Sequence, residues 1–139
     1  MNTEPTTDPT IEPVTGSLVE LHGIAVLDYA PDSPVLRTEQ DALDVLGDAF
    51  GVHAELVVVP VSRLAQEFFT LDSGLAGAII QKFVTYHRRL VILGDIAGQL
   101  AGSSALRAFV YESNRGNHVW FLADRDELDQ RLRPAAEPD

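Results

Sequence analysis

Apolar residues follow two different patterns along the chain. Three stretches carry nearly continuous β-branched and aliphatic residues: ELVVVPV at 55–61, RLVILGD at 89–95 and HVWFLA at 118–123. Such continuous runs are typical of strands that are covered on both faces. Between and after them, apolar residues recur every three to four positions, which predicts amphipathic helices. These helical stretches cover residues 39–50, 72–86, 103–114 and 124–133.

The first apolar segment, SLVELHGIAVLDYA at 17–30, has a different form. Two short apolar runs flank His22 and Gly23, and glycine accepts the positive φ of a tight turn. This pattern predicts a β-hairpin. The strands that follow are separated by helices, which implies right-handed crossovers and a parallel sheet. We therefore expect an α/β fold with a mixed, mostly parallel sheet of about four to five strands, an N-terminal hairpin and about four helices.

Helix starts are marked by capping residues. Thr38 precedes the first helix, and Asp41 stands three positions later as the partner of a capping box. The stretch FFTLDSGLAGAIIQKF at 68–83 raises a sharper question, because two large rings precede a polar helix start. Asp72 and Ser73 are good capping residues for a helix that begins there. Gly74, Gly77 and Ala78 line another side of this helix and leave room for self-association, so a homodimer is possible.

Composition sets the domain limits. Residues 1–17 and 134–139 are rich in Pro and acids and poor in large apolar residues, which predicts disordered tails around one domain at 18–133. The chain has no cysteine and no apolar run of membrane-spanning length, and its start lacks a signal-peptide pattern. A cytoplasmic protein without membrane contacts is the expectation.

Charge and motifs narrow the functional classes. A net charge of −11 opposes the phosphate neutralisation that nucleic-acid binding requires. The four histidines are not spaced as a metal pair on one helix face, and no phosphate-binding loop, dinucleotide fingerprint or nucleophile elbow is present. We therefore assign no catalytic residue, no metal and no cofactor from the sequence, and whether the protein is an enzyme stays open.

The order of elements resembles the STAS fold of anti-sigma-factor antagonists and sulfate-transporter tails. Those domains carry a D-S-S/T-G-L motif where the central strand meets its helix, and Leu71-Asp72-Ser73-Gly74-Leu75 stands at that point here. The resemblance implies a regulatory domain that binds other proteins. Asp72 occupies the position of the phosphoacceptor hydroxyl, and its carboxylate crudely resembles the phosphorylated state. An alignment shifted by one residue would instead make Ser73 the acceptor.

The chain is also similar to a bacterial family of unknown function, DUF4180, and this likeness extends over several blocks. They are the QDALD segment at 40–44, the FFTLDSGLAG segment with its QKF at 68–83, Gly94-Asp95 at a strand end and ESNRG at 112–116. The likeness supports one family over most of the domain and implies no activity.

Six residues are candidates for a binding site. Phe68 and Phe69 are adjacent, so one ring is expected in the core while the other covers a loop or stays exposed as a binding anchor. The next candidates, Asp72 and Ser73, contact a partner in one interpretation and only cap the helix in the other. Glu67 and Asp95 would lie near carboxyl ends of parallel strands, where α/β sheets bind ligands. As alternatives, Glu67 is merely solvated and Asp95 caps a turn.

Two functions follow from these candidates. The first is a non-catalytic STAS-like module that binds a protein partner through the Phe68–Ser73 loop and the helix after it. The alternative is a small-molecule-binding protein or cofactor-independent enzyme that uses the strand-end crevice near Glu67, Asp72 and Asp95.

Overall fold

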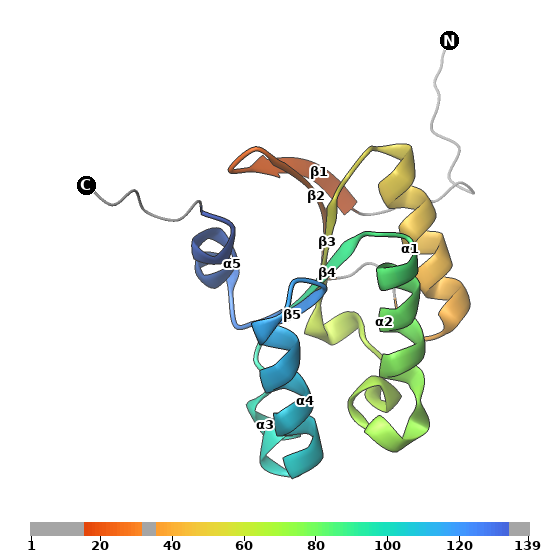
Figure 1. The fold of residues 1–139 in the computed structure, drawn as a ribbon, viewed down its shortest axis with the longest axis vertical. Helices are drawn as coiled ribbons and strands as arrows, with labels where there is room; N and C mark the ends of the chain where they lie inside the picture. Colours follow the sequence, from red (N-terminus) through yellow and green to blue (C-terminus); the bar gives the residue numbers. More distant parts are fainter. Residues whose placement is uncertain (1–15, 32–35, 134–139) are drawn as a thin grey trace.

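A five-stranded sheet organises the chain (Figure 1). The structure, a computed structural model, describes residues 16–31 and 36–133. The strands are β1 (Gly16–Leu21), β2 (Ile24–Tyr29), β3 (Leu56–Pro60), β4 (Arg89–Leu93) and β5 (Val119–Leu122), and they lie side by side in chain order. β1 and β2 form an antiparallel hairpin, and β2 to β5 are parallel. The predicted α/β class and mixed sheet are therefore confirmed.

Helices cover the two faces of the sheet unequally. The helices are α1 (Glu39–Gly51), α2 (Leu75–Thr85), the short α3 (Ala97–Ala101), α4 (Ser104–Arg115) and α5 (Arg125–Leu132). Because strand order equals chain order, right-handed crossovers place α1, α2 and α4 on the same face. The last helix, α5, packs on the opposite face.

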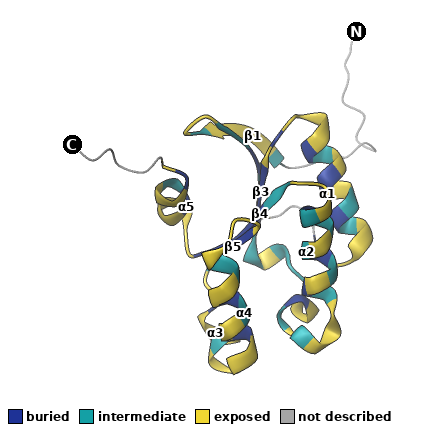
Figure 2. Cartoon of the chain, viewed as in Figure 1, coloured by how far each residue is buried: buried dark blue, intermediate teal, exposed yellow. Residues whose placement is uncertain are grey.

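Two hydrophobic cores result from this arrangement. The larger core joins alternate strand residues to the inner sides of α1, α2 and α4, and includes Val57, Leu90 and Phe83. The smaller core lies under α5 and includes Val58, Val91 and Leu128. In Figure 2 strands β3 to β5 and the inner helix sides are mostly buried, while β1 and the outer helix sides are mostly exposed. Burial on both faces explains why the parallel strands read as continuous apolar runs.

Several local predictions agree with the structure. His22 and Gly23 both have positive φ, and Leu21 pairs with Ile24 across this two-residue turn. The capping box at the start of α1 is complete, because Thr38 Oγ1 accepts from Asp41 N while Asp41 Oδ2 accepts from Thr38 N, each at 3.1 Å.

Other boundaries differ from the sequence prediction. Helix α2 begins at Leu75, because the chain before it forms three short 3₁₀ turns, η1 (Val61–Arg63), η2 (Gln66–Phe69) and η3 (Leu71–Ser73). Helix α3 was not predicted, since five residues are too few to show a periodicity. Gly16 and Ser17, which composition assigns to the tail, form the start of β1. The remaining residues of both predicted tails lie outside the described ranges.

Candidate functional site

The two phenylalanines before α2 pack against the larger core beside β5. Phe68 is 1% exposed and lies on β5, with its ring centroid 6.4 Å from that of Phe121. Phe69 is half-buried and packs edge-on against Phe68 at 5.4 Å. Phe109 of α4 completes the group, 6.0 Å from Phe121. One ring is thus in the core, as expected from the sequence, and the other covers it from the loop.

The polar residues of this loop face solvent. Glu67, Asp72 and Ser73 are all exposed. The Ser73 hydroxyl donates to the Glu67 carbonyl at 2.7 Å and accepts from Leu75 N at 3.2 Å, which fixes the loop against the start of α2. The N-cap residue itself is Gly74, with φ of 79°. Of the two predicted capping side chains, Ser73 therefore takes part in the helix start.

Asp95 has a local role after β4. Its Oδ1 accepts from Ala97 N at 2.8 Å and closes a turn just before α3, as the structural alternative from the sequence describes. Between the described residues, no hydrogen bond or ion pair joins Asp95 to Glu67 or Asp72. The structure places five predicted residues in one loop and Asp95 in another.

A cavity of about 320 Å³ lies at the carboxyl ends of the strands, on the side of α5. Its walls include Pro60, Gly94 and Arg125. The Arg125 guanidinium makes two bonds to the Asp28 carboxylate, at 2.6 and 3.0 Å, and this hydrogen bonding raises the pKa of Arg125. None of the six predicted residues lines this cavity.

Tyr29 is the buried polar group at the edge of the same cavity. Its ring is 2% exposed, and its hydroxyl donates to Asp48 Oδ2 at 2.8 Å. Burial, followed by the bond to this carboxylate, raises the pKa of the Tyr29 phenol. The hydroxyl therefore already donates its proton to a side chain of α1.

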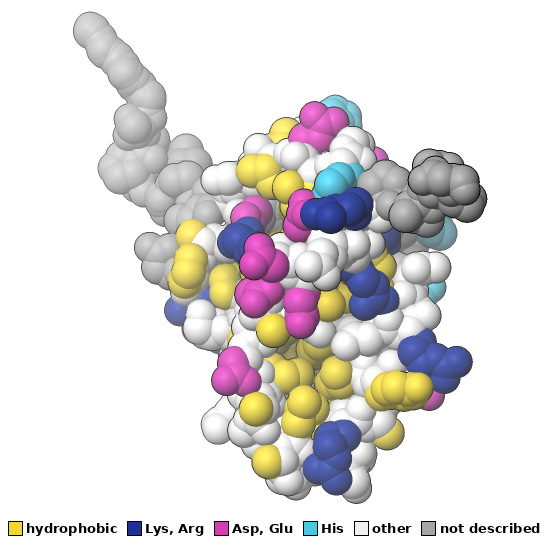
Figure 3. Space-filling model, turned by 90° about the vertical axis from the view of Figure 1, so that its left-hand side faces the viewer, with side chains coloured by type: hydrophobic (Ala, Val, Ile, Leu, Met, Phe, Trp, Pro, Cys, Tyr) yellow, Lys and Arg dark blue, Asp and Glu magenta, His cyan; other side chains and the backbone are white. Residues whose placement is uncertain are grey.

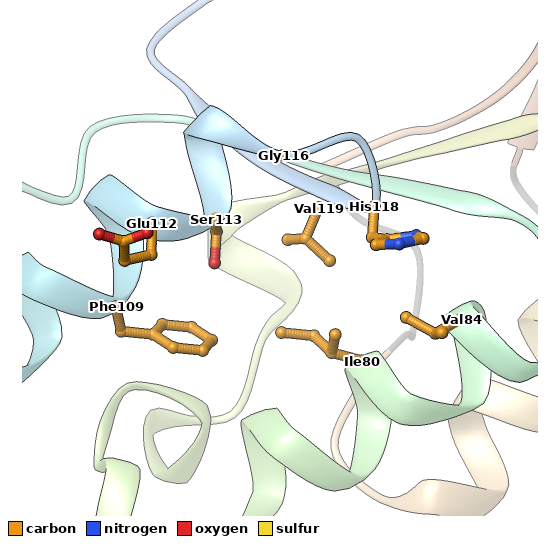
Figure 4. A pocket seen from close by; sticks show the side chains of 8 residues that line it. All are labelled: Ile80, Val84, Phe109, Glu112, Ser113, Gly116, His118 and Val119. Carbon is orange, nitrogen blue, oxygen red and sulfur yellow. The ribbon is translucent and has the colours of Figure 1, made fainter.

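A second cavity, of about 290 Å³, opens between α2 and α4 (Figure 4). Ile80, Val84, Phe109 and Val119 form its apolar wall. Glu112, Ser113, Gly116 and His118 complete the lining. Sequence reasoning missed this site, because its residues come from two helices and one strand that the chain pattern does not connect. The only available signal was Ile80 and Val84, four apart on one helix face.

The ESNRG block has a structural role next to this cavity. Asn114 Oδ1 accepts from Phe121 N at 2.6 Å, and Asn114 Nδ2 donates to Phe121 O at 3.1 Å. The side-chain amide thus pairs with the free edge of β5 as a neighbouring strand would. Trp120 Nε1 donates to Gly116 O at 2.7 Å. Arg115 and Glu112 form an i, i+3 ion pair at 3.8 Å.

Exposed aromatic residues gather at the C-terminal ends of α1 and α2. Phe50 and Tyr86 are 40% and 43% exposed, and their rings meet edge to face at 6.0 Å. The Arg88 guanidinium lies 4.2 Å from the Phe50 ring centre, and Val52 is also exposed. We call Phe50, Val52, Tyr86 and Arg88 the aromatic patch. The sequence predicted a binding anchor at the Phe68–Phe69 pair before α2, whereas this patch lies at the other end of that helix.

Neither the distribution of charged side chains nor a search for metal ligands reveals a further site among the described residues. On the face that carries α5, acidic side chains gather mostly in the upper half and hydrophobic ones in the lower half (Figure 3). Within residues 16–31 and 36–133, no group of three or more His, Cys, Asp or Glu side chains is arranged to hold a metal ion. No helix in that part of the chain has the length and apolar character needed to span a membrane.

Comparison with known proteins places the chain in one family. The model of DUF4180, described as a domain of unknown function, matches residues 21–132, which is well over half of the chain. Neither a curated protein nor a solved structure matches it. The matched segment runs from the end of β1 to the end of α5. This chain therefore belongs to the DUF4180 family of domains of unknown function.

Proposed function

We propose that the protein is a non-catalytic, STAS-like module that acts by binding a protein partner through the Phe68–Ser73 loop and α2. The observation that carries this proposal is the aromatic patch at the end of α2. Aromatic and arginine side chains that are rigidly held and partly exposed are the residues that dominate protein–protein binding energy. The resemblance of Leu71-Asp72-Ser73-Gly74-Leu75 to the STAS motif is a second argument for the proposal.

The proposed surface extends from the loop along α2. Gly77, Gln81 and Thr85 are exposed at every fourth position and so share one helix face, which ends beside Tyr86. Figure 2 shows exposed residues along both the loop and the outer side of this helix. Glu67 and Asp72 form the polar rim at the loop end. Because Phe68 and Phe69 anchor the loop from inside, the rim is held in place before a partner binds.

A partner search with matched variants tests this proposal. The wild-type chain is used as bait in lysate of the source organism, and a captured protein is purified for direct titration. Tyr86→Ala should weaken its binding about tenfold, since hot-spot truncations cost more than 1 kcal/mol. Asp72→Lys should weaken it as well. Tyr111→Ala is the control, because Tyr111 is 63% exposed but belongs to α4, which is not part of the proposed binding surface. Equal affinities for all four proteins, or no partner, would contradict the proposal.

The strand-end cavity supports the second candidate function, small-molecule binding or cofactor-independent catalysis. Its volume of about 320 Å³ suits a small ligand, and Asp124 and Arg125 provide charged groups at its wall. In this function those two residues take the place of Glu67, Asp72 and Asp95 as the polar groups. A metabolite that raises the melting temperature of the wild type, and fails to do so when Ala123→Leu places a larger side chain at the cavity wall, would favour this candidate.

A further inference from the structure

We propose that the cavity between α2 and α4 binds a small organic cation, with an apolar ring or branched chain as its body and one ammonium group as its head. This site uses Ile80 and Val84 of α2, whereas the protein-binding surface uses Gly77, Gln81 and Thr85 of the same helix, and the inference does not depend on that surface. The argument rests on the apolar wall, the polar groups at the rim and the size of the cavity.

The wall selects an apolar body. Ile80 and Val84 of α2 face Phe109 of α4 across the opening, and Val119 of β5 lies between them (Figure 4). Ile80 and Phe109 pack on the larger core and are only partly buried, so they keep apolar surface in water. A ligand ring inserted between them would remove that surface from water, which is the main source of affinity in small apolar pockets.

The rim selects a positive charge. The Ser113 hydroxyl is turned toward the opening, Glu112 lies next to it with its carboxylate on the outer side of the rim, and His118 stands at the other end above Val84 (Figure 4). Both Glu112 and Ser113 belong to the last turns of α4, whose C-terminal end carries a partial negative charge. The Ser113 hydroxyl has no hydrogen-bond partner among the described residues. An ammonium group at this rim would therefore meet the Ser113 hydroxyl and the nearby Glu112 carboxylate.

The competing ion pair is weak. Arg115 Nη1 lies 3.8 Å from Glu112 Oε2, and the two side chains are 64% and 70% exposed. Exposed pairs of this kind contribute little to stability, so Glu112 is available to a ligand. The net charge of −11 further favours the approach of a cation and disfavours an anion.

The size of the cavity excludes larger occupants. About 290 Å³ is at the lower limit for a ligand pocket, and it holds a single ring with a short side chain. A helix or an extended peptide needs a long groove with repeated anchor positions. The residues that line this cavity form one compact opening, which does not suit a helix or a peptide.

Three matched compounds test the proposal: 2-phenylethylamine, 2-phenylethanol and phenylacetate. Each is titrated into the ¹⁵N-labelled full chain, and amide shifts are followed by NMR. We expect saturable shifts at Ile80, Phe109, Ser113 and Val119. The amine should bind about three times more tightly than the alcohol, as expected for one exposed ion pair, and phenylacetate should bind most weakly. Added salt should reduce the preference for the amine.

Two kinds of variants separate the wall from the rim. Ile80→Phe fills the cavity and should abolish the shifts; if it fails to fold, Val84→Phe serves instead. Glu112→Gln should bring the amine and the alcohol within twofold of each other, while Glu127→Gln on α5 should leave their ratio unchanged. Shifts outside the cavity, an absence of saturable shifts, equal affinity of the wild type for all three compounds, or an amine preference that survives Glu112→Gln would overturn the proposal.

Discussion

The side-chain amide of Asn114 makes two hydrogen bonds with the backbone of Phe121, at the outer edge of the sheet. β5 is the last strand, so its outer N–H and C=O groups have no neighbouring strand. All four residues of β5 are buried, and unpaired backbone groups at such a place are costly. Arg131 also donates to the Asn114 carbonyl, which links this residue to α5.

Asn114→Ala should lower the free energy of unfolding by about 2 kcal/mol, because both backbone groups of Phe121 lose their partner. Urea unfolding followed by the fluorescence of Trp120, the single tryptophan, measures the change. Asn117→Ala is the matched control, since Asn117 is exposed and makes no hydrogen bond with other described residues. If Asn114→Ala lowers the free energy of unfolding no more than Asn117→Ala does, the contacts at the sheet edge are not stabilising.

Residues with local roles were predictable, and those with distant partners were not. The bonds of Thr38 and Asp95 connect atoms two or three positions apart, so capping rules identify them from the sequence. Phe68 meets Phe121 only after the sheet forms, so alternation predicted one buried ring without saying which of the two it is. Asn114, two positions before Gly116, is typical of a helix end, and that pattern hides its contact with β5.

Helix α5 is held to the sheet by few buried side chains. Its buried residues are Leu128 and Leu132, and polar contacts complete its attachment. His22 in the hairpin turn lies 2.8 Å from Asp129 Oδ1, and Arg125 makes its paired bonds to Asp28 of β2. The Arg131 guanidinium stacks over the Trp120 ring at 4.3 Å. The second face of the sheet is thus covered through contacts that depend on charge.

Acid should weaken the attachment of α5. The hydrogen bond from Arg133, followed by that from His22, holds the pKa of Asp129 below its usual value. The folded state then binds fewer protons than the unfolded state in acid, so this stabilisation is present above the ordinary carboxyl pKa and is lost as pH falls through the lowered value. Asp129→Asn should be less stable than the wild type at pH 7, and the difference should vanish toward pH 2.

Urea unfolding at several pH values, followed by Trp120 fluorescence, tests whether the stability difference between the wild type and Asp129→Asn disappears in acid. Glu20→Gln is the control, since Glu20 is exposed on β1 and forms no ion pair with other described residues. The free energy of unfolding of Glu20→Gln should stay close to that of the wild type at every pH. A difference for Asp129→Asn that is constant across the pH range would show that the ionised carboxylate is not what attaches the helix.

The sequence predicted element types better than element starts. Continuous apolar runs identified β3, β4 and β5, because these strands are buried on both faces. The start of α2 was placed too early, since Asp72 and Ser73 are capping residues that here belong to a 3₁₀ turn. The αL conformation of Gly74 separates that turn from the helix, and a backbone φ cannot be read from residue type.

At the scale of the whole molecule, strand order explains why the predicted carboxylates do not form one site. The strands follow chain order, so the crossovers after β3 and β4 lead to the same face. A ligand crevice at the carboxyl ends of an α/β sheet usually forms where neighbouring crossovers lead to opposite faces. Without such a reversal, the loops that hold Glu67 and Asp95 turn the same way.

The exposed face of α2 gives the remaining prediction, which concerns assembly. A side chain placed on Gly77 would meet nothing within 4 Å, and the same is true of Gly47 on α1. Gly77→Lys and Gly47→Lys should therefore each raise the free energy of unfolding by about 0.5 kcal/mol through helix propensity. If the face of Gly74, Gly77 and Ala78 mediates a homodimer, only Gly77→Lys should dissociate it, because the lysine would stand inside the contact. Sedimentation equilibrium of the three proteins decides this. A wild type that stays monomeric, or a dimer that survives Gly77→Lys, would contradict self-association through α2, and α2 would then be exposed for a different partner.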